Sequence, residues 1–354
     1  MFYVEKRLDP KIYERIMLAA NHTEPDRVPI WDYLDNRATM DHFAPGETDL
    51  LEANVKTYHG LGIDLCRGYG GSYTEADDGT TTENSRISGR TSWLTDYPIK
   101  TLDDLADYPL PDPDPGKLRE GWLAETRRAI DAFAPKTMYV PGAGCGFHAV
   151  YGLMGLELFS YAMFDRPDEV QRLQDGFSRQ SVAVAELAAA ERLAPLFFIG
   201  DDIAYKDKLM FSPDYLRRTC VRMIAAMCEP LNRAGIQVVF HSDGNLNDIL
   251  DDLVEAGIAG INPIEPLAGM DIGQLKRRYG KRLILVGNVD CSVVLPLGTR
   301  DQVIEATRAC LRAAAPGGGH FIGSSSELTP ATPLENALAF YETCRTDGQY
   351  PIRC

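Results

Sequence analysis

The residues best suited to chemistry follow one short apolar run in the second half of the chain. Val238–Phe240 are apolar and favour β-structure, and they lead directly into His241, with Asp243 two residues later and a Gly244-Asn245 turn after it. This pattern is typical of a buried parallel strand whose C-terminal end carries polar residues. Because side chains alternate along an extended segment, His241 and Asp243 can face the same side. An imidazole and a carboxylate placed in this way could bind a divalent metal or exchange protons with a substrate.

The rest of the chain repeats this alternation of an apolar strand, a polar turn and a helical segment. The strand candidates are residues 28–31, 63–66, 138–140, 196–199, 238–240, 258–262, 283–286 and 320–323. Each is followed by sequence with helical spacing of apolar residues, and an amphipathic helix is expected before the first strand, at 8–20. Eight alternating units predict an α/β protein with a single (β/α)8 TIM barrel. An open doubly wound sheet is the alternative, but the Gly-rich fingerprint that usually follows its first strand is absent.

One region interrupts the alternation after the second strand. Residues 80–95 alternate Thr, Ser and Arg around a few apolar side chains, which predicts an inserted β-hairpin. The Pro-rich run at 109–115 predicts a stiff connector. Because the alternation of strands and helices continues beyond it, we interpret 80–115 as an insertion and connector within a single domain spanning 1–354.

Composition and charge exclude several classes of partner. The chain has 36 Lys and Arg against 51 Asp and Glu, a formal net charge of -15, which argues against nucleic acids and anionic membrane surfaces. No apolar run approaches the roughly 20 residues of a membrane-spanning helix, and no signal peptide is recognisable at the N-terminus. The eight cysteines show no close pairing. We therefore expect a cytoplasmic protein with reduced thiols.

In a (β/α)8 barrel the C-terminal ends of all strands meet at one mouth, and the polar residues there form the predicted site. The predicted catalytic residues are His241, Asp243, Glu265 and Asp201. The predicted substrate-binding residues are Tyr33, Asp35, Arg67, Tyr69, Cys145, Asp202, Asn288 and Ser326. The predicted metal ligands are His241, Asp243, Glu265 and Glu327. Carboxylates together with an imidazole suit zinc.

Structural roles remain open for several of these residues. His241 could be a buried, hydrogen-bonded histidine or a general acid without any metal, and Asp243 could stabilise the turn that follows it. The pair Asp201-Asp202 could cap the next segment. Cys145, which lies between glycines, could be an inert small residue, and Tyr69 could cover the barrel rim.

The run from His241 to Asn245 also resembles the uroporphyrinogen decarboxylase superfamily when it is read together with other blocks of the chain. The further matching blocks are Gly155–Glu157, Phe211–Pro213, Gly257–Pro266, Gly269–Asp271, Val286–Asp290 and Pro330–Asn336. The resemblance extends from about Arg27 over nearly the whole chain. It implies a single (β/α)8 barrel, in agreement with the strand count.

The true decarboxylases of this superfamily carry groups that are missing here. They have an arginine-rich segment after the first strand, an aspartate after the second, and a late Gly-His-Gly histidine. At these positions the chain has Tyr33–Arg37 with its acidic Asp35, then Tyr69–Gly71, and finally Ser326. These differences and the net charge of -15 argue against decarboxylation of a polycarboxylate porphyrinogen.

The other branch of the superfamily comprises cobalamin-dependent methyltransferases, and the resemblance therefore implies zinc and a partner protein that carries a corrinoid (cobalamin). Coenzyme M-type members bind zinc through His-x-Cys and a later Cys; here His241 matches, but Asp243 and Ser326 replace the cysteines. A zinc held by Asp243, Glu265 or Glu327 would be more Lewis acidic, which favours polarising an ether or amine leaving group over activating a thiol.

We therefore expect a methyltransferase that moves a methyl group from a small methylated donor to the corrinoid protein. A methoxylated compound is the expected donor, which makes the enzyme an O-demethylase type. One alternative is a metal-independent decarboxylase or lyase that acts on a smaller acid, with His241 as proton donor. Another is a non-catalytic barrel that binds a small molecule or a corrinoid. The sequence leaves the oligomeric state open, with a homodimer as one candidate.

Overall fold

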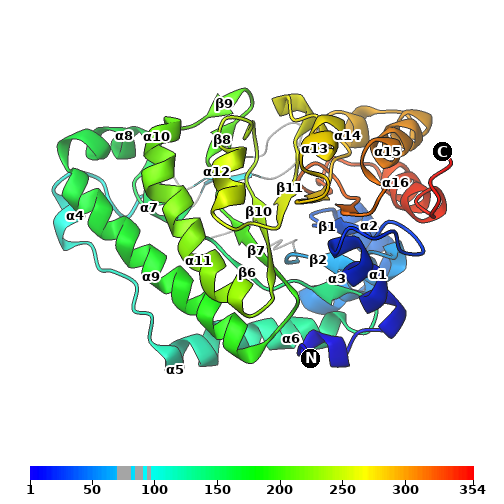
Figure 1. Ribbon diagram of the computed structural model, residues 1–354, viewed down its shortest axis with the longest axis horizontal. Coiled ribbons are helices and arrows are strands. Elements are labelled where there is room, and N and C mark those ends of the chain that lie inside the picture. The colour runs from blue at the N-terminus through cyan, green and yellow to red at the C-terminus, as the bar shows by residue number, and fades with distance from the viewer. Residues whose placement is uncertain (70–80, 84–90, 94–96) are drawn as a thin grey trace.

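The computed structural model describes residues 1–69, 81–83, 91–93 and 97–354, and its central element is a set of parallel strands surrounded by helices (Figure 1). One ladder has the order β1 (Trp31–Asp32), β2 (Leu65–Cys66), β5 (Met138–Tyr139). The other has the order β6 (Gly142–Ala143), β7 (Leu196–Gly200), β10 (Gln237–His241), β11 (Gly260–Asn262), β12 (Ile284–Val286), β13 (His320–Phe321).

The two ladders join at both ends. On one side β5 continues along the chain into β6. On the other side the Trp31 N–H donates to the Ile322 carbonyl at 2.9 Å, and the Ile322 N–H donates to the Pro29 carbonyl at 3.0 Å. The ladder therefore returns to its first strand with eight strand positions, as in a (β/α)8 barrel, and the expected fold class is confirmed.

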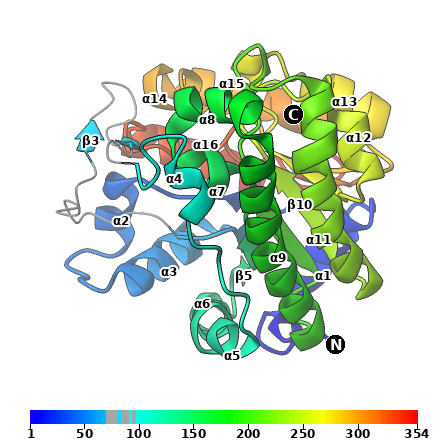
Figure 2. The ribbon, with the colours of Figure 1, turned by 90° about the vertical axis from the view of Figure 1, so that its left-hand side faces the viewer.

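Helices cover the outside of this sheet. The longer ones are α1 (Pro10–Ala20), α3 (Leu50–Leu61), α6 (Ala124–Phe133), α8 (Gly155–Asp165), α9 (Pro167–Glu191), α11 (Arg222–Arg233), α13 (Ile272–Tyr279), α15 (Arg300–Ala314) and α16 (Leu334–Thr346). The shorter ones are α2 (Arg37–Phe43), α4 (Asp104–Asp107), α5 (Pro115–Leu118), α7 (Phe147–Gly152), α10 (Pro213–Leu216), α12 (Leu250–Glu255), α14 (Val294–Leu297) and the single turns η1 (Val4–Lys6), η2 (Arg119–Leu123), η3 (Arg217–Val221) and η4 (Pro266–Ala268). The long helices α9 and α11 lie side by side in both views (Figure 2). In the described part of the chain, no helix combines the length and the apolar character that crossing a bilayer requires.

Local sequence explains where these helices begin and end. At the start of α15 the Thr299 and Gln302 side chains each bond the other's backbone N–H, which satisfies two donors that the first turn leaves free. At the end of α3 the chain turns at Gly62 with a φ of 72°, a left-handed conformation that favours glycine. This turn delivers the chain directly into β2 and hence to Arg67 at the barrel mouth.

Two small hairpins decorate the barrel. The hairpin expected within 80–95 is represented by β3 (Thr81–Glu83) and β4 (Thr91–Trp93), which pair antiparallel; the other residues of that stretch lie outside the described part. A second hairpin, β8 (Ala204–Tyr205) with β9 (Lys208–Leu209), follows β7 and was not expected. It lies at the top of Figure 1, on the side where β7 and β10 end.

The second hairpin packs against the turn that follows His241. The Asn245 N–H donates to the Tyr205 carbonyl at 3.0 Å. Gly244 has a φ of 88°, and a Cβ at this position would come within 2.6 Å of the Tyr205 carbonyl oxygen. The close approach therefore requires glycine, and it fixes the position of the neighbouring Asp243.

Candidate metal centre and substrate site

His241 ends strand β10 with its ring orientation fixed by the neighbouring strand. Its Nδ1 lies 2.7 Å from Oδ1 of Asn262, the residue directly opposite it on β11. The Asn262 amide nitrogen points toward the Val286 carbonyl at 3.5 Å, so Oδ1 accepts the Nδ1–H and the Nε2 lone pair of His241 is left free. Burial, reinforced by the charge of Arg67, lowers the pKa of His241 and favours this neutral form.

Two carboxylates face the free Nε2 of His241. It lies 4.0 Å from Oδ1 of Asp202 and 3.9 Å from Oδ1 of Asp243, distances too long for hydrogen bonds. The Asp202 carboxylate also accepts the Asp243 N–H at 3.0 Å, which links the loops after β7 and β10. Asp202, His241 and Asp243 form a cluster: each offers one potential ligand atom, and these three atoms lie within 4.8 Å of one another. It is the group of this kind found among residues 1–69 and 97–354.

The donor chemistry of this cluster fits a divalent metal. Oδ1 of Asp243 is buried, and it has no hydrogen-bond partner in the part of the chain that the structure describes. The Asp243 side chain is 47% exposed, so its other oxygen can contact water, whereas a cation between Oδ1 and the other two groups would give Oδ1 the partner that it lacks. The Asn262 bond to Nδ1 is the outer hydrogen bond that metal-bound histidines usually make.

Glu265 lies next to this cluster but is not part of it. Its Oε2 accepts the Gly244 N–H at 2.9 Å, so the carboxylate holds the turn that carries Asp243. Burial raises the pKa of Glu265, and the charges of Asp243 and Asp290 raise it further. The geometry therefore gives Glu265 a positioning contact with the ligand loop.

Asp201 and Cys145 lie together beneath the mouth rather than in the cluster. The buried Asp201 carboxylate accepts the backbone N–H groups of Cys145 and His148, and it thereby caps the segment leading into α7. The Cys145 Sγ lies 3.7 Å from the Cys220 Sγ, and burial raises the pKa of the Cys145 thiol well above its usual value. Asp201 therefore has a structural contact, but with a segment that precedes it in the chain rather than with the next segment, as the sequence alternative had it. The buried Cys145 thiol has a raised pKa, as an unreactive cysteine does.

Arg67 packs against two aromatic rings at the mouth. Its guanidinium carbon lies 4.8 Å from the ring centroid of Tyr33 and 5.1 Å from that of Phe198, and Nη2 donates to the Ser326 carbonyl at 3.1 Å. Burial raises the pKa of the neighbouring Glu327 to about 6, and the charge of Arg67 acts against this rise. Glu327 therefore holds a proton closer to neutral pH than an ordinary glutamate does.

The remaining predicted residues lie further from the three-residue cluster. The charge of Asp35 contributes to the raised pKa of Glu327, so the two acids lie on the same side of the mouth. Tyr69 is exposed, with its ring centroid 6.1 Å from that of Phe133. Asn288 is buried and donates its side-chain N–H to the Ile264 carbonyl at 2.8 Å, which fixes the loop after β11.

Two residues of the site escaped the sequence reasoning, namely Asn262 and Phe198. The ring of Phe198 lies 5.4 Å from that of His241 and 5.1 Å from the Arg67 guanidinium, so both groups pack against it. A signal was present for Asn262, since it ends an apolar strand at the same edge as His241. No comparable signal exists for Phe198, which reads as an ordinary core residue of its strand.

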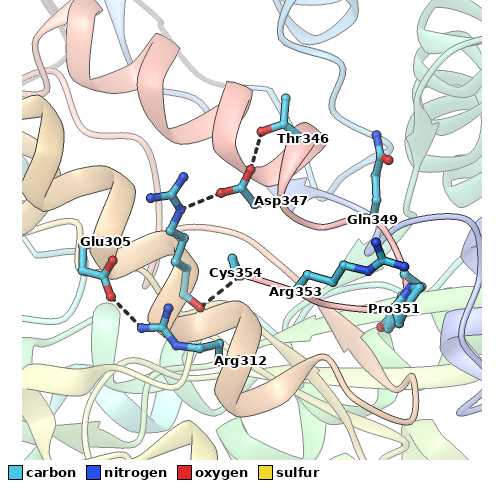
Figure 3. Close-up of a pocket in the computed structure, with 10 residues that line it drawn as sticks. Glu305, Arg312, Thr346, Asp347, Gln349, Pro351, Arg353 and Cys354 are labelled. Carbon is cyan, nitrogen blue, oxygen red and sulfur yellow. Dashed lines mark hydrogen bonds and ion pairs between the residues drawn. The ribbon is translucent and has the colours of Figure 1, made fainter.

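A cavity of about 590 Å³ lies elsewhere, between α15, α16 and the C-terminal segment (Figure 3). Its lining includes Arg308, Arg312 and Asp347, and none of the predicted site residues lines it. Arg308 is paired with Asp347 and Arg312 with Glu305, each at 2.6 Å. These pairs leave the cavity without the unsatisfied groups found at the barrel mouth.

Comparison with known proteins gives the family. The profile of the family described as "Uroporphyrinogen decarboxylase (URO-D)" matches residues 12–346. The methylcobamide:CoM methyltransferase MtaA of Methanosarcina barkeri is 27% identical over 187 residues, 53% of this chain and 52% of that protein. A uroporphyrinogen decarboxylase of Alkalilimnicola ehrlichii is 25% identical over 264 residues, 70% of this chain and 67% of that protein.

The solved structures agree on the fold. A methyltransferase from Methanosarcina mazei has a TM-score of 0.70 at 20% sequence identity, over 94% of this chain and 98% of that one. The aligned part spans only about half of the length of the curated MtaA relative. The family profile, in contrast, covers nearly all of the chain, and the protein belongs to the uroporphyrinogen decarboxylase family.

Proposed function

We propose that this protein is a methyltransferase that transfers a methyl group from a small methylated donor, most simply a methoxylated compound, to a corrinoid protein. The observation that carries the proposal is the unbonded Nε2 of His241 facing the carboxylates of Asp202 and Asp243. Relatives named methylcobamide:CoM methyltransferase and methylated-thiol–coenzyme M methyltransferase support the reaction class. Within this reaction class, the proposed methyl acceptor is a corrinoid.

The proposed metal is zinc, held by Asp202, His241 and Asp243. The sequence grouped Glu265 and Glu327 with the ligands, whereas the geometry favours Asp202 in their place, because its Oδ1 faces Nε2. Bound zinc would supply Lewis acidity at the leaving oxygen of the donor. A ligand set without thiolate suits this role better than the activation of a thiol.

The chain's own residues then have distinct tasks. Asn262 accepts the Nδ1–H of His241 and presents Nε2 to the site, while Glu265 holds the turn that carries Asp243. Glu327, with a pKa of about 6, can hold a proton at its carboxyl group and release it to the departing oxygen when the methyl group leaves. Phe198 and Tyr33 give the donor apolar surfaces between the two polar sides.

A second candidate is a metal-independent decarboxylase or lyase, which the similarity to a uroporphyrinogen decarboxylase supports. In that reaction His241 would donate a proton. Its lowered pKa leaves Nε2 without a proton near neutral pH, and the proton on Nδ1 is bonded to Asn262, so His241 has no proton free to donate and the geometry favours the methyltransferase. A purely binding barrel is the third possibility, and turnover measurements separate it from both.

The test combines metal analysis with methylation of cob(I)alamin as a surrogate acceptor. We expect zinc to co-purify and methylcobalamin to form with methoxylated donors. Variants His241→Ala and Asp202→Asn should lose zinc and turnover together, whereas Asp248→Asn, an exposed change in the same loop region, should retain both. A protein without zinc that fails to methylate cobalamin from ether or amine donors would refute the proposal. Metal-free decarboxylation of a small acid would establish the second candidate.

A further inference from the structure

Arg67 has hydrogen-bonding capacity that the protein does not use. An arginine side chain carries five N–H donors, and the structure records one hydrogen bond from Arg67, to the Ser326 carbonyl at 3.1 Å. Among residues 1–69 and 97–354, no carboxylate oxygen lies within 4.0 Å of its guanidinium nitrogens. The absence of a pair is informative because acids lie nearby: the charges of Arg67, Asp35 and Asp243 all act on the Glu327 carboxyl group.

Aromatic packing explains why Arg67 does not close onto these acids. The guanidinium lies against the rings of Tyr33 and Phe198, at 4.8 Å and 5.1 Å from their centroids. Cation–π contacts of this kind hold the guanidinium plane and also bury part of it. The donors that remain are therefore presented to the mouth in a fixed orientation.

Arg67 is also a close neighbour of the proposed metal centre. Its guanidinium and the His241 ring contact the same Phe198 ring, at 5.1 Å and 5.4 Å from its centroid. The charge of Arg67 also lowers the pKa of His241, so the guanidinium lies near the cluster of Asp202, His241 and Asp243. A single small molecule that lies along Phe198 can contact both ends.

The unused donors select the chemistry of the ligand at the Arg67 end. A guanidinium presents two parallel N–H groups that match the two oxygens of a carboxylate, and such charge-assisted pairs are strong. A neutral ligand would leave the positive charge unpaired in an aromatic slot. A polyanion would face the acids that surround the site, whereas a single carboxylate matches the one guanidinium of Arg67.

We propose that Arg67 binds the carboxylate of the methyl donor, so that the substrates are small methoxylated monocarboxylic acids whose methoxy group points toward Asp202, His241 and Asp243. The identity of the transferred group rests on the function proposed above. The carboxylate contact does not, because it can be measured as binding without any turnover.

The test compares two probes that differ only in charge, 4-methoxybenzoate and 4-methoxybenzamide, with methoxyacetate as an aliphatic acid. Isothermal titration calorimetry on the protein as purified should show the benzoate binding at least about 10-fold more tightly than the amide. Arg67→Gln should weaken benzoate binding by about 10- to 100-fold and leave amide binding unchanged. Arg67→Lys keeps the charge without the two-pronged geometry and should restore only part of the affinity.

A matched control removes a cation elsewhere. Arg233→Gln deletes an exposed arginine that pairs with Glu229 at 3.3 Å, and it should not change either affinity. Equal binding of benzoate and amide by the wild type, or equal losses for both probes in Arg67→Gln, would overturn the proposal. So would the absence of binding by both 4-methoxybenzoate and methoxyacetate.

The outcomes also separate this inference from the proposed function. Arg67-dependent binding of the acids without methyl transfer would refute the proposed methyltransferase function and support the carboxylate contact. Methyl transfer from neutral ethers that Arg67→Gln does not change would support the methyltransferase function and refute the carboxylate contact.

Discussion

The buried histidine of strand β13, His320, should make the stability of this barrel depend on pH. Its Nε2 lies 2.8 Å from the Gly287 carbonyl, and its Nδ1 is buried with no partner among the described residues. Burial lowers the pKa of His320 from 6.5 to about 4. The folded protein therefore resists a proton that the unfolded chain accepts below about pH 6.5.

The sign and the size of the effect follow from this difference. Between about pH 6.5 and about pH 4 the unfolded state binds more protons than the folded state, so the free energy of unfolding falls as pH falls. Each unit of this window contributes about 1.4 kcal/mol. At about pH 5 the loss that His320 causes should be about 2 kcal/mol, and it should level off near about 3 kcal/mol below pH 4.

Urea unfolding at about pH 7.5 and about pH 5 measures the effect in the wild type and in His320→Gln, whose amide can keep the bond to Gly287. Other groups titrate in both proteins, so the relevant quantity is the difference between their two losses. We expect the wild type to lose about 2 kcal/mol more than the variant. His42→Gln, on the exposed part of α2, is the control and should behave as the wild type. Equal losses in the wild type and His320→Gln would refute the reasoning.

Three further changes probe the site and its supports. Asn262→Ala should weaken the proposed zinc binding by about 10- to 100-fold in chelator competition, because His241, the proposed ligand, loses its hydrogen bond to Asn262; unchanged affinity would deny Asn262 that role. Gly244→Ala should lower the melting temperature markedly, since its Cβ meets the backbone of Tyr205, whereas Gly235→Ala has a similar φ of 75° with open space and should cost much less. Asp64→Asn should destabilise the fold by about 3–5 kcal/mol in urea, because two partly buried arginines lose their common partner; a cost below 1 kcal/mol would contradict this.

The fold was predictable because its signal is local. Each strand is an apolar run bounded by polar or glycine residues, and each helix repeats apolar residues at helical spacing, so the order of elements can be read along the chain. The β8–β9 hairpin was missed because it has only two residues in each strand and is defined by its packing against Gly244. A stabilising contact of this kind leaves no periodic pattern.

The residues of the candidate cluster were all among those predicted for the site, but which of them lie together was not predicted. His241 lies opposite Gly200 on β7, so Asp202 and Asp243, each two residues further along, come to face one another. This register is set by the whole sheet and cannot be read from either strand alone. Alternation explains the different environments of the two consecutive acids, since Asp201 faces inward to α7 while its neighbour faces the mouth.

In the turn after His241, the position of residue 243 is set by backbone contacts and does not depend on which side chain that residue carries. Successive main-chain N–H groups at 243, 244 and 245 are held by Asp202, Glu265 and the Tyr205 carbonyl. These three anchors engage backbone atoms, so they would keep the turn in place whatever side chain stood at 243. A single substitution of Asp243 by cysteine would replace a hard oxygen ligand with a soft sulfur ligand, while the backbone of the turn kept its position. The same architecture could therefore diversify its chemistry over evolution without first having to rebuild its fold.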